Sequence, residues 1–291
     1  MLSGALLQKG NTAMCHACVI ETVKSNMLSR RSFFRGGVAA AAAATVAAVP
    51  QPLFADAPPL FADGLPAKAE DLTHELHENF PTFFGGQQLW YDKKFSHDKD
   101  GFNLYELRVN EHTGTHIDAP LHFSADGRSV AELPVEDLVA PLVVVDIRAR
   151  AAEDADAQLT PDDLKAWTDA NGELPEGAVV ALNSGWDAHV GTDRFRNADA
   201  EGKMHFPGFH IDAIHQLLEG SAKAIAVDTL SLDFGPSADF AVHNTWLPAG
   251  RYGIEGVANL GSLPAKGATI VVGAPKVRGG TGGPGRVFAF V

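Results

Sequence analysis

Short runs of β-branched and aliphatic residues, separated by polar turns, recur along the second half of the chain. Residues 142–147, 178–182 and 223–228 are the clearest of these runs. Strands buried on both faces of a sheet have this pattern, because neither face has to be polar. Residues 268–273 and 286–291 have the same character and predict the last two strands. The pattern therefore indicates a sheet with a buried centre.

Two segments between these runs have helical character. In the first, Thr160 is a suitable N-cap before Pro161 and two acidic residues, and Gly172 suits the end of the helix. In the second, residues 210–218, one helical face collects Ile211, Ile214, Leu217 and Leu218. Strands alternating with helices predict an α/β domain. We see no boundary that would divide residues 70–291.

Three other stretches carry structural expectations. Residues 102–109 alternate apolar and polar side chains, and we expect them to pair beside the strand that contains His112. The glycine-rich residues 279–285 lack the lysine and the following helix of a phosphate-binding loop, which predicts a mobile connection near the pocket. Polar residues at the end of the 223–228 strand would either orient ligands and substrate or cap the local structure; they are Asp228, Ser231 and Asp233.

The N-terminal part of the chain has the pattern of an export signal. Arg30 and Arg31 precede an alanine-rich, weakly apolar run at residues 36–49. This run is too short and too mildly hydrophobic to act as a permanent membrane anchor. The pattern predicts export by the twin-arginine machinery. The mature protein would therefore be periplasmic or secreted. An alanine-rich helix preceded by chance arginines is the alternative.

The predicted domain boundaries follow from this signal. Residues 1–26 would precede it, so we expect translation to start at Met27 rather than Met1. Cleavage after Ala48 would suit the small residues there. Residues 1–49 are then the N-terminal extension with its signal, the Pro- and Ala-rich residues 50–69 are a linker, and residues 70–291 form the folded domain.

Charge and cysteine content narrow the possible partners and ligands. The formal net charge of the 291-residue chain is −13, which argues against a nucleic-acid partner. Both cysteines, Cys15 and Cys18, lie ahead of the signal. Any metal bound by residues 70–291 must therefore be held by nitrogen and oxygen donors.

Metal-capable side chains gather in residues 112–123. His112, His116 and Asp118 share one parity, so in an extended strand they would point to the same face. Gly114 lies between the histidines and leaves room for an ion or a substrate. The other face would carry the β-branched residues Thr113, Thr115 and Ile117.

A fourth candidate follows this strand. Pro120 ends the ladder and turns the chain, which would bring His122 back over the same site. Imidazoles and a carboxylate suit Zn²⁺ or Mn²⁺. Single histidines are more often surface or hydrogen-bonded core residues, and His-x-x-x-His on a helix also binds zinc. Four ligand-type residues within eleven positions nevertheless favour a metal site on a strand and turn.

Residues 112–123 resemble the His-x-Gly-Thr-His-x-Asp-x-Pro-x-His signature of the cyclase-like metal-dependent hydrolases. This superfamily includes kynurenine formamidases and isatin hydrolases, and the resemblance extends over most of the chain after about residue 70. It implies a single domain of swivelling β/β/α architecture that forms a homodimer or homotetramer. It also implies that the metal ligands are His112, His116 and Asp118, with His122 as the catalytic acid/base.

The resemblance also points to His243 and Glu255, which their spacing alone would not single out. It implies that Asp118 bridges two ions about 3.5–4 Å apart. His112 and His116 would hold one ion and His243 the other, while Glu255 would serve either or both. The expected cofactor is thus one or two Zn²⁺ or Mn²⁺ ions per chain.

Phe83 is the candidate substrate-binding residue. In kynurenine formamidases a tryptophan near this position helps to form the substrate pocket, whereas this chain has Phe83 and Phe84 before Gly85. The departure weakens a specific assignment to formylkynurenine. A plain core role for both phenylalanines is the alternative.

These observations predict metal-dependent hydrolysis of a C–N bond in a small amide, either an aryl formamide or a cyclic amide. His122 would transfer the proton to the leaving nitrogen, a role suited to a group that titrates near pH 6.5. Lactone hydrolysis or dehydration on the same scaffold is one alternative. A secreted metal- or ligand-binding protein without turnover is another, although simple binding would not need the additional base.

Overall fold

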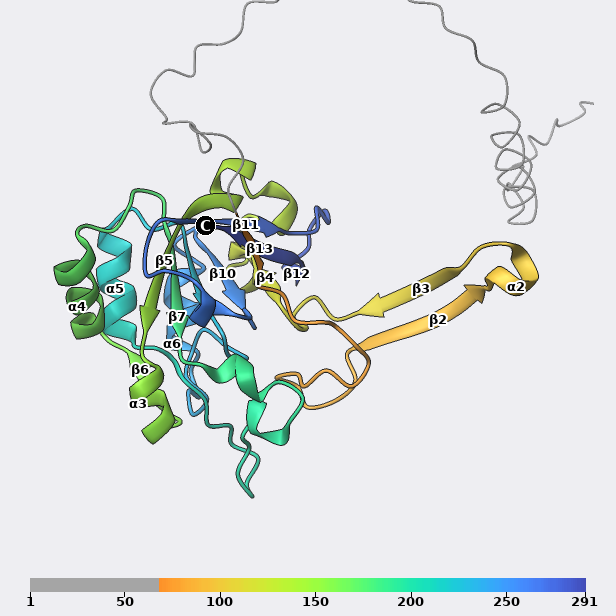
Figure 1. The fold of residues 1–291 in the computed structure, drawn as a ribbon, viewed down its shortest axis with the longest axis horizontal. Coiled ribbons are helices and arrows are strands. Elements are labelled where there is room, and N and C mark those ends of the chain that lie inside the picture. The colour runs from red at the N-terminus through yellow and green to blue at the C-terminus, as the bar shows by residue number, and fades with distance from the viewer. Residues whose placement is uncertain (1–67) are drawn as a thin grey trace, which may run out of the picture. The chain divides into compact units, whose positions relative to one another are not determined.

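The computed structural model describes residues 68–291 (Figure 1). The predicted signal, start residue and cleavage site lie outside these described residues, and so does the linker as far as residue 67. Within residues 68–291, no helix combines the length and hydrophobicity that crossing a membrane requires.

The main element is a nine-stranded sheet whose four central strands are parallel. The strands on either side of this centre run antiparallel to their neighbours. The order across the sheet is β1 (Ala69–Asp71), β13 (Arg286–Phe290), β11 (Ala268–Gly273), β5 (Val139–Asp146), β7 (Val179–Asn183), β9 (Ala224–Val227), β10 (Tyr252–Glu255), β4 (His116–Asp118) and β12 (Gly282–Pro284). The five strands predicted from apolar runs are confirmed, with boundaries that differ by a few residues.

Both faces of the central strands are buried, as the apolar runs predicted. One face packs against the helices through Val143, Val145, Val180, Leu182, Ile225 and Val227. The alternate residues join a second core with side chains from strands at both ends of the sheet, including Ile117, Ile254, Ile270 and Val287. Strands at opposite ends share this core because the sheet curls. The mixed α/β single domain agrees with the predicted fold class.

The helices cover one face of the sheet (Figure 1). In α4 (Pro161–Asn171), Thr160 and Asp163 form a capping box, and Gly172 is the C-cap, as predicted. The other helices in this layer are α3 (Arg148–Glu153), α5 (Ile211–Glu219) and α6 (Ala241–Trp246). A small parallel sheet joins β6 (Gln158–Leu159) to β8 (Gly208–Phe209).

A two-stranded ribbon extends away from the rest of the described chain (Figure 1). It consists of β2 (Leu89–Phe95) and β3 (Leu104–Val109), with the short helix α2 (His97–Asp100) at its tip. The expectation that residues 102–109 pair beside the His112 segment is wrong, because β3 pairs with β2. A local hairpin needs little loop closure, whereas β4 takes its partners, β10 and β12, from much later in the sequence.

The glycine-rich segment forms part of the sheet, so the prediction of a mobile connection is wrong. In β12, Gly282 is the register partner of Asp118 in β4. A Cβ atom on Gly282 would lie 2.3 Å from the Ile117 carbonyl oxygen and 2.9 Å from Cε1 of His112. Glycine therefore allows the edge strand to approach the metal-capable residues closely.

Replacing Gly282 by Ala should destabilise the protein. The new methyl group has no space, and overpacking of this kind costs about 1–3 kcal/mol of the free energy of unfolding. Thermal unfolding followed by circular dichroism should show a midpoint lower by roughly 2–4 °C per kcal/mol. Gly86→Ala is the control, since a Cβ there meets nothing within 4 Å. Equal midpoints for the two variants would contradict this account of Gly282.

Candidate active site

The first part of the metal-capable motif, residues 112–118, is a turn, and only its last part is a strand. Only His116–Asp118 belong to β4, and Gly114 has a left-handed φ of 69°. The expectation of one extended strand over residues 112–118 is therefore wrong for its first half. The side chains still converge, because His112 Nδ1 lies 2.7 Å from Asp118 Oδ1.

His122 returns over this group, as the proline turn predicted. Residues Pro120–His122 form a 3₁₀ turn directly after β4. The ring of His122 then stacks on the ring of His112, with the two centroids 3.8 Å apart. The second predicted pair comes from distant elements, His243 from α6 and Glu255 from the end of β10.

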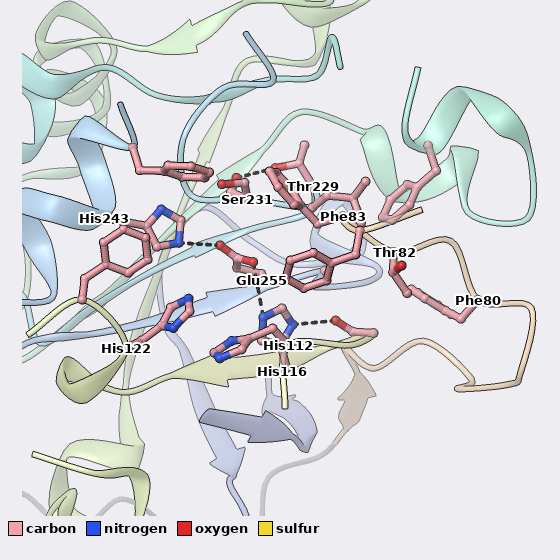
Figure 2. Close-up of a pocket in the computed structure, with 17 residues that line it drawn as sticks. Phe80, Thr82, Phe83, His112, His116, His122, Thr229, Ser231, His243 and Glu255 are labelled. Carbon is pink, nitrogen blue, oxygen red and sulfur yellow. Dashed lines mark hydrogen bonds and ion pairs between the residues drawn. The ribbon is translucent and has the colours of Figure 1, made fainter. Parts of the chain in front are cut away.

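Figure 2 shows His112, His116, His243 and Glu255 facing a common space, and the Asp118 carboxylate lies within 3.4 Å of nitrogen atoms of the three histidines. Glu255 is the register partner of His116, and its Oε2 lies 3.3 Å from His116 Nε2. His243 Nε2 lies 3.1 Å from Glu255 Oε1 and 3.4 Å from Asp118 Oδ2. The donors fall into two groups that share Asp118, one with His112 and His122 and one with His116 and Glu255. The assignment of each residue to one ion stays a prediction.

The chemistry of this donor set fits a divalent metal ion. Among the described residues, His116 Nε2 and Asp118 Oδ2 are buried polar atoms without a hydrogen-bond partner. Burying such atoms unpaired is costly, and an ion would supply the missing partner. Ligand atoms about 2.0–2.2 Å from a tetrahedral zinc ion lie about 3.3–3.6 Å from one another. The separations around Glu255 and Asp118, 3.1–3.4 Å, are close to that range.

Other groups orient the three histidines. His116 Nδ1 lies 2.9 Å from the Gly114 carbonyl oxygen, and His243 Nδ1 lies 2.6 Å from Asp233 Oδ2. Both contacts favour the Nδ1–H tautomer, which leaves Nε2 free for an ion. His112 is oriented the other way, with Nε2 3.0 Å from Thr281 Oγ1 and Nδ1 facing Asp118.

The carboxylates dominate the electrostatics of the site. Burial lowers the pKa of His116, but contacts with Asp118 and Glu255 outweigh it and raise this pKa to about 10. His243 is also raised well above its usual pKa, by Asp118, Asp233 and Glu255 against the effect of burial. The site therefore attracts positive charge. Burial instead lowers the pKa of His122 to about 4.

Above the donors lies a pocket with a cavity volume of about 230 Å³, walled by six phenylalanines. Figure 2 shows Phe80 and Phe83 among its wall residues, opposite His122 and His243. The sequence identifies Phe83 as the substrate-binding candidate, with Phe84 beside it, whereas the other four escape sequence reasoning: Phe80, Phe123, Phe195 and Phe240. Of these, only Phe123 stands beside a motif residue. Phe80 lies between β1 and β2, Phe195 in the 3₁₀ turn Asp193–Phe195 and Phe240 at the N-cap of α6, so no shared periodicity would have revealed them.

The polar residues after β9 have three different roles. Asp228 accepts hydrogen bonds from the backbone N–H groups of Ser184 and Trp186 and so stabilises the turn after β7. Ser231 lines the pocket, and Asp233 orients His243. Both expectations for this segment, orientation of ligands and local capping, are thus met by different residues.

Known proteins show clear similarity to this chain. The family model Cyclase matches residues 70–234. Isatin hydrolase from Roseibium aggregatum is 35% identical over 207 residues, which are 67% of this chain and 78% of that protein. Kynurenine formamidase from Salinibacter ruber is 28% identical over 200 residues, covering 69% of this chain and 85% of that protein.

Solved structures agree with the sequence matches. An isatin hydrolase bound to the product analogue thioisatinate superposes with a TM-score of 0.73 at 33% identity, covering 77% of this chain and 92% of that one. Isatin hydrolase A from Ralstonia solanacearum gives a TM-score of 0.72 at 35% identity, again over 77% and 92% of the two chains.

Proposed function

Because this chain belongs to the cyclase family of metal-dependent hydrolases, we propose that it hydrolyses the C–N bond of a small, neutral aromatic amide. The observation that carries this proposal is the set of metal donors lying at one wall of a pocket built from six phenylalanines. The relatives named isatin hydrolase and kynurenine formamidase support the same reaction class, hydrolysis of a non-peptide amide.

The pocket wall supports an uncharged aromatic substrate. Phenyl rings bind flat aromatic groups by stacking and edge-to-face contact. Among the described residues that line the pocket, none is a lysine or an arginine. A zwitterionic amino-acid group, such as formylkynurenine carries, would lose its hydration there without gaining a charged partner for its carboxylate. A cyclic amide such as isatin, or a simple aryl formamide, fits this wall better.

The residues that would hold the metal are His112, His116, Asp118, His243 and Glu255. A divalent ion bound there would activate water and polarise the substrate carbonyl. His122 is neutral near pH 7, because burial lowers its pKa. This differs from the expectation of a group titrating near 6.5. Neutral imidazole can accept a proton during water attack and then pass it to the leaving nitrogen.

The identity and number of the ions are a further part of the proposal. Nitrogen and oxygen donors without thiolates suit Zn²⁺ or Mn²⁺. Asp118 lies within 3.4 Å of nitrogen atoms of His112, His116 and His243, which supports a bridging role and two ions per chain. For localisation, we propose export by the twin-arginine route to the periplasm or the exterior, supported by Arg30 and Arg31 before a weakly apolar run.

A substrate panel tests the reaction and its specificity. Metal-loaded protein should hydrolyse isatin or a simple aryl formamide with a kcat/KM at least about 100-fold above that for formylkynurenine, since burying an unpaired charge is costly. Initial rates would be measured spectrophotometrically with aliphatic lactones as the control class. Faster turnover of the lactones would favour the alternative reaction. Metal binding without turnover of any substrate would favour the binding protein.

A further inference from the structure

His112 differs from the other two metal-capable histidines in the group that orients it. The Nδ1 atoms of His116 and His243 face a backbone carbonyl and a carboxylate, which accept hydrogen bonds. His112 instead turns Nε2 towards a hydroxyl group, Thr281 Oγ1, at 3.0 Å. A hydroxyl both donates and accepts, so by itself it does not decide which ring nitrogen of His112 carries the proton.

The Glu111 carboxylate decides the direction of this hydrogen bond. Its Oε2 atom lies 2.5 Å from Thr281 Oγ1. A carboxylate only accepts hydrogen bonds, and those from hydroxyl groups are short and strong. The single hydroxyl proton of Thr281 therefore points to Glu111, and the Thr281 oxygen accepts from His112 Nε2–H. His112 Nδ1 then keeps a free lone pair on the side of Asp118 Oδ1, 2.7 Å away.

The backbone fixes Thr281 in this place from two sides. Thr281 directly precedes β12, and its N–H donates to Glu111 Oε2 as well. Its carbonyl accepts from the N–H of Ala119, the residue that follows Asp118. The hydroxyl is thus held at a fixed position beside the metal-capable residues.

Glycines on both sides of Thr281 make the close approach possible. A Cβ atom on Gly280 would lie 3.0 Å from Glu111 Oε1, and one on Gly282 would lie 2.9 Å from His112 Cε1. Larger residues at these two positions would push Thr281 away from both partners. The glycine-rich sequence around Thr281 therefore suits a hydroxyl placed between Glu111 and His112.

Glu111 has no other function among the described residues. Within residues 68–291, its side chain forms hydrogen bonds to Thr281 and no salt bridge. If Glu111 only held the edge strand, its bond to the Thr281 N–H would suffice, and the side chain at position 281 would not matter. The contact with the hydroxyl is the one that connects Glu111 to His112.

We propose that Glu111 and Thr281 are positioning residues for the metal ion. Glu111 orients the Thr281 hydroxyl, and this hydroxyl fixes His112 with Nδ1 free for an ion shared with Asp118. Hydrogen bonds of this kind hold a ligating histidine in place, and their loss weakens metal binding about 10- to 100-fold. The inference rests on the metal site of the proposed function and adds two residues outside the pocket lining.

The Zn²⁺ affinity of the full chain, depleted of metal beforehand, tests this arrangement by competition with a chromophoric chelator. Thr281→Val keeps the shape of the side chain but removes the hydroxyl, and should weaken Zn²⁺ binding about 10- to 100-fold. If two ions bind, only the step that fills the His112 position should weaken. Thr281→Ser restores the hydroxyl and should bind like the wild type. Thr168→Val is the matched control, because the Thr168 hydroxyl bonds to the Lys165 carbonyl within α4.

A double-mutant cycle separates orientation of His112 from support of the edge strand. Glu111→Ala alone should weaken Zn²⁺ binding and lower the unfolding midpoint of the metal-free protein, because the Thr281 N–H loses its acceptor. Combined with Thr281→Val, Glu111→Ala should still lower the midpoint, since this N–H remains. It should weaken Zn²⁺ binding no further, because Glu111 acts on His112 through the hydroxyl that is already gone.

Three results would overturn the inference. They are wild-type Zn²⁺ affinity in Thr281→Val, affinity in Thr281→Ser as low as in Thr281→Val, and equal losses from Glu111→Ala with and without the hydroxyl. Each of these leaves the proposed function standing, because the wild type still binds metal. A wild type without Zn²⁺ affinity would instead remove the metal site on which both proposals rest.

Discussion

Replacement of Asp118 by Asn should remove the bound metal and lower kcat by at least about 1,000-fold. Asp118 is fully buried and is the one residue common to both donor groups. Its carboxylate lies within 3.4 Å of nitrogen atoms from His112, His116 and His243. The amide keeps the shape but removes the charge, so both metal positions lose a ligand. A metal contributes several kcal/mol to such reactions, and each 1.36 kcal/mol changes the rate tenfold.

Elemental analysis and initial rates on the same preparations measure this effect. Asp228→Asn is a matched control, because Asp228 is equally buried but bonds to the turn after β7. That variant should retain its metal. His243→Ala should deplete only one of two ions. Full metal content in Asp118→Asn would contradict the site, whereas one ion per wild-type chain under saturating metal would exclude only the binuclear form.

The second large effect is expected for His122→Gln, which should keep its metal and lose about 10²–10⁴-fold in kcat. This is the usual range for removing a general acid or base. His122 stacks on His112 and lines the pocket, so it can reach both the water and the leaving group of a bound amide. Glutamine preserves polarity but cannot accept and then release a proton.

The pH–rate profile distinguishes a His122 that transfers protons from one that only binds metal or takes no part in the reaction. Burial lowers the pKa of His122 to about 4, so the neutral base is present above this pKa and lost as the pH falls through it. The wild type should show an acid-side limb that the variant lacks. His205→Gln is the control, since His205 pairs with Asp156 and Asp199 outside the pocket. Joint loss of metal and activity would make His122 a ligand, and full activity would exclude it from catalysis.

The sequence by itself determined the elements whose signals are local. The central strands were identifiable because successive residues, which point to opposite faces of the sheet, are all apolar. Such a run is stable only where both faces are buried. The start of α4 was identifiable because Thr160 and Asp163 cap it through contacts within one turn. The metal-capable motif was identifiable for the same reason, since four of its side chains lie within eleven positions.

Only the tertiary structure decided how distant segments combine. It showed that β3 pairs with β2, that β12 packs beside β4, and that Gly114 turns the chain before the short strand of the motif. The phenylalanine pocket likewise comes from loops far apart in the sequence. Strand pairing and pocket walls depend on contacts between remote residues, and neither periodicity nor spacing within one segment encodes which remote partner is chosen.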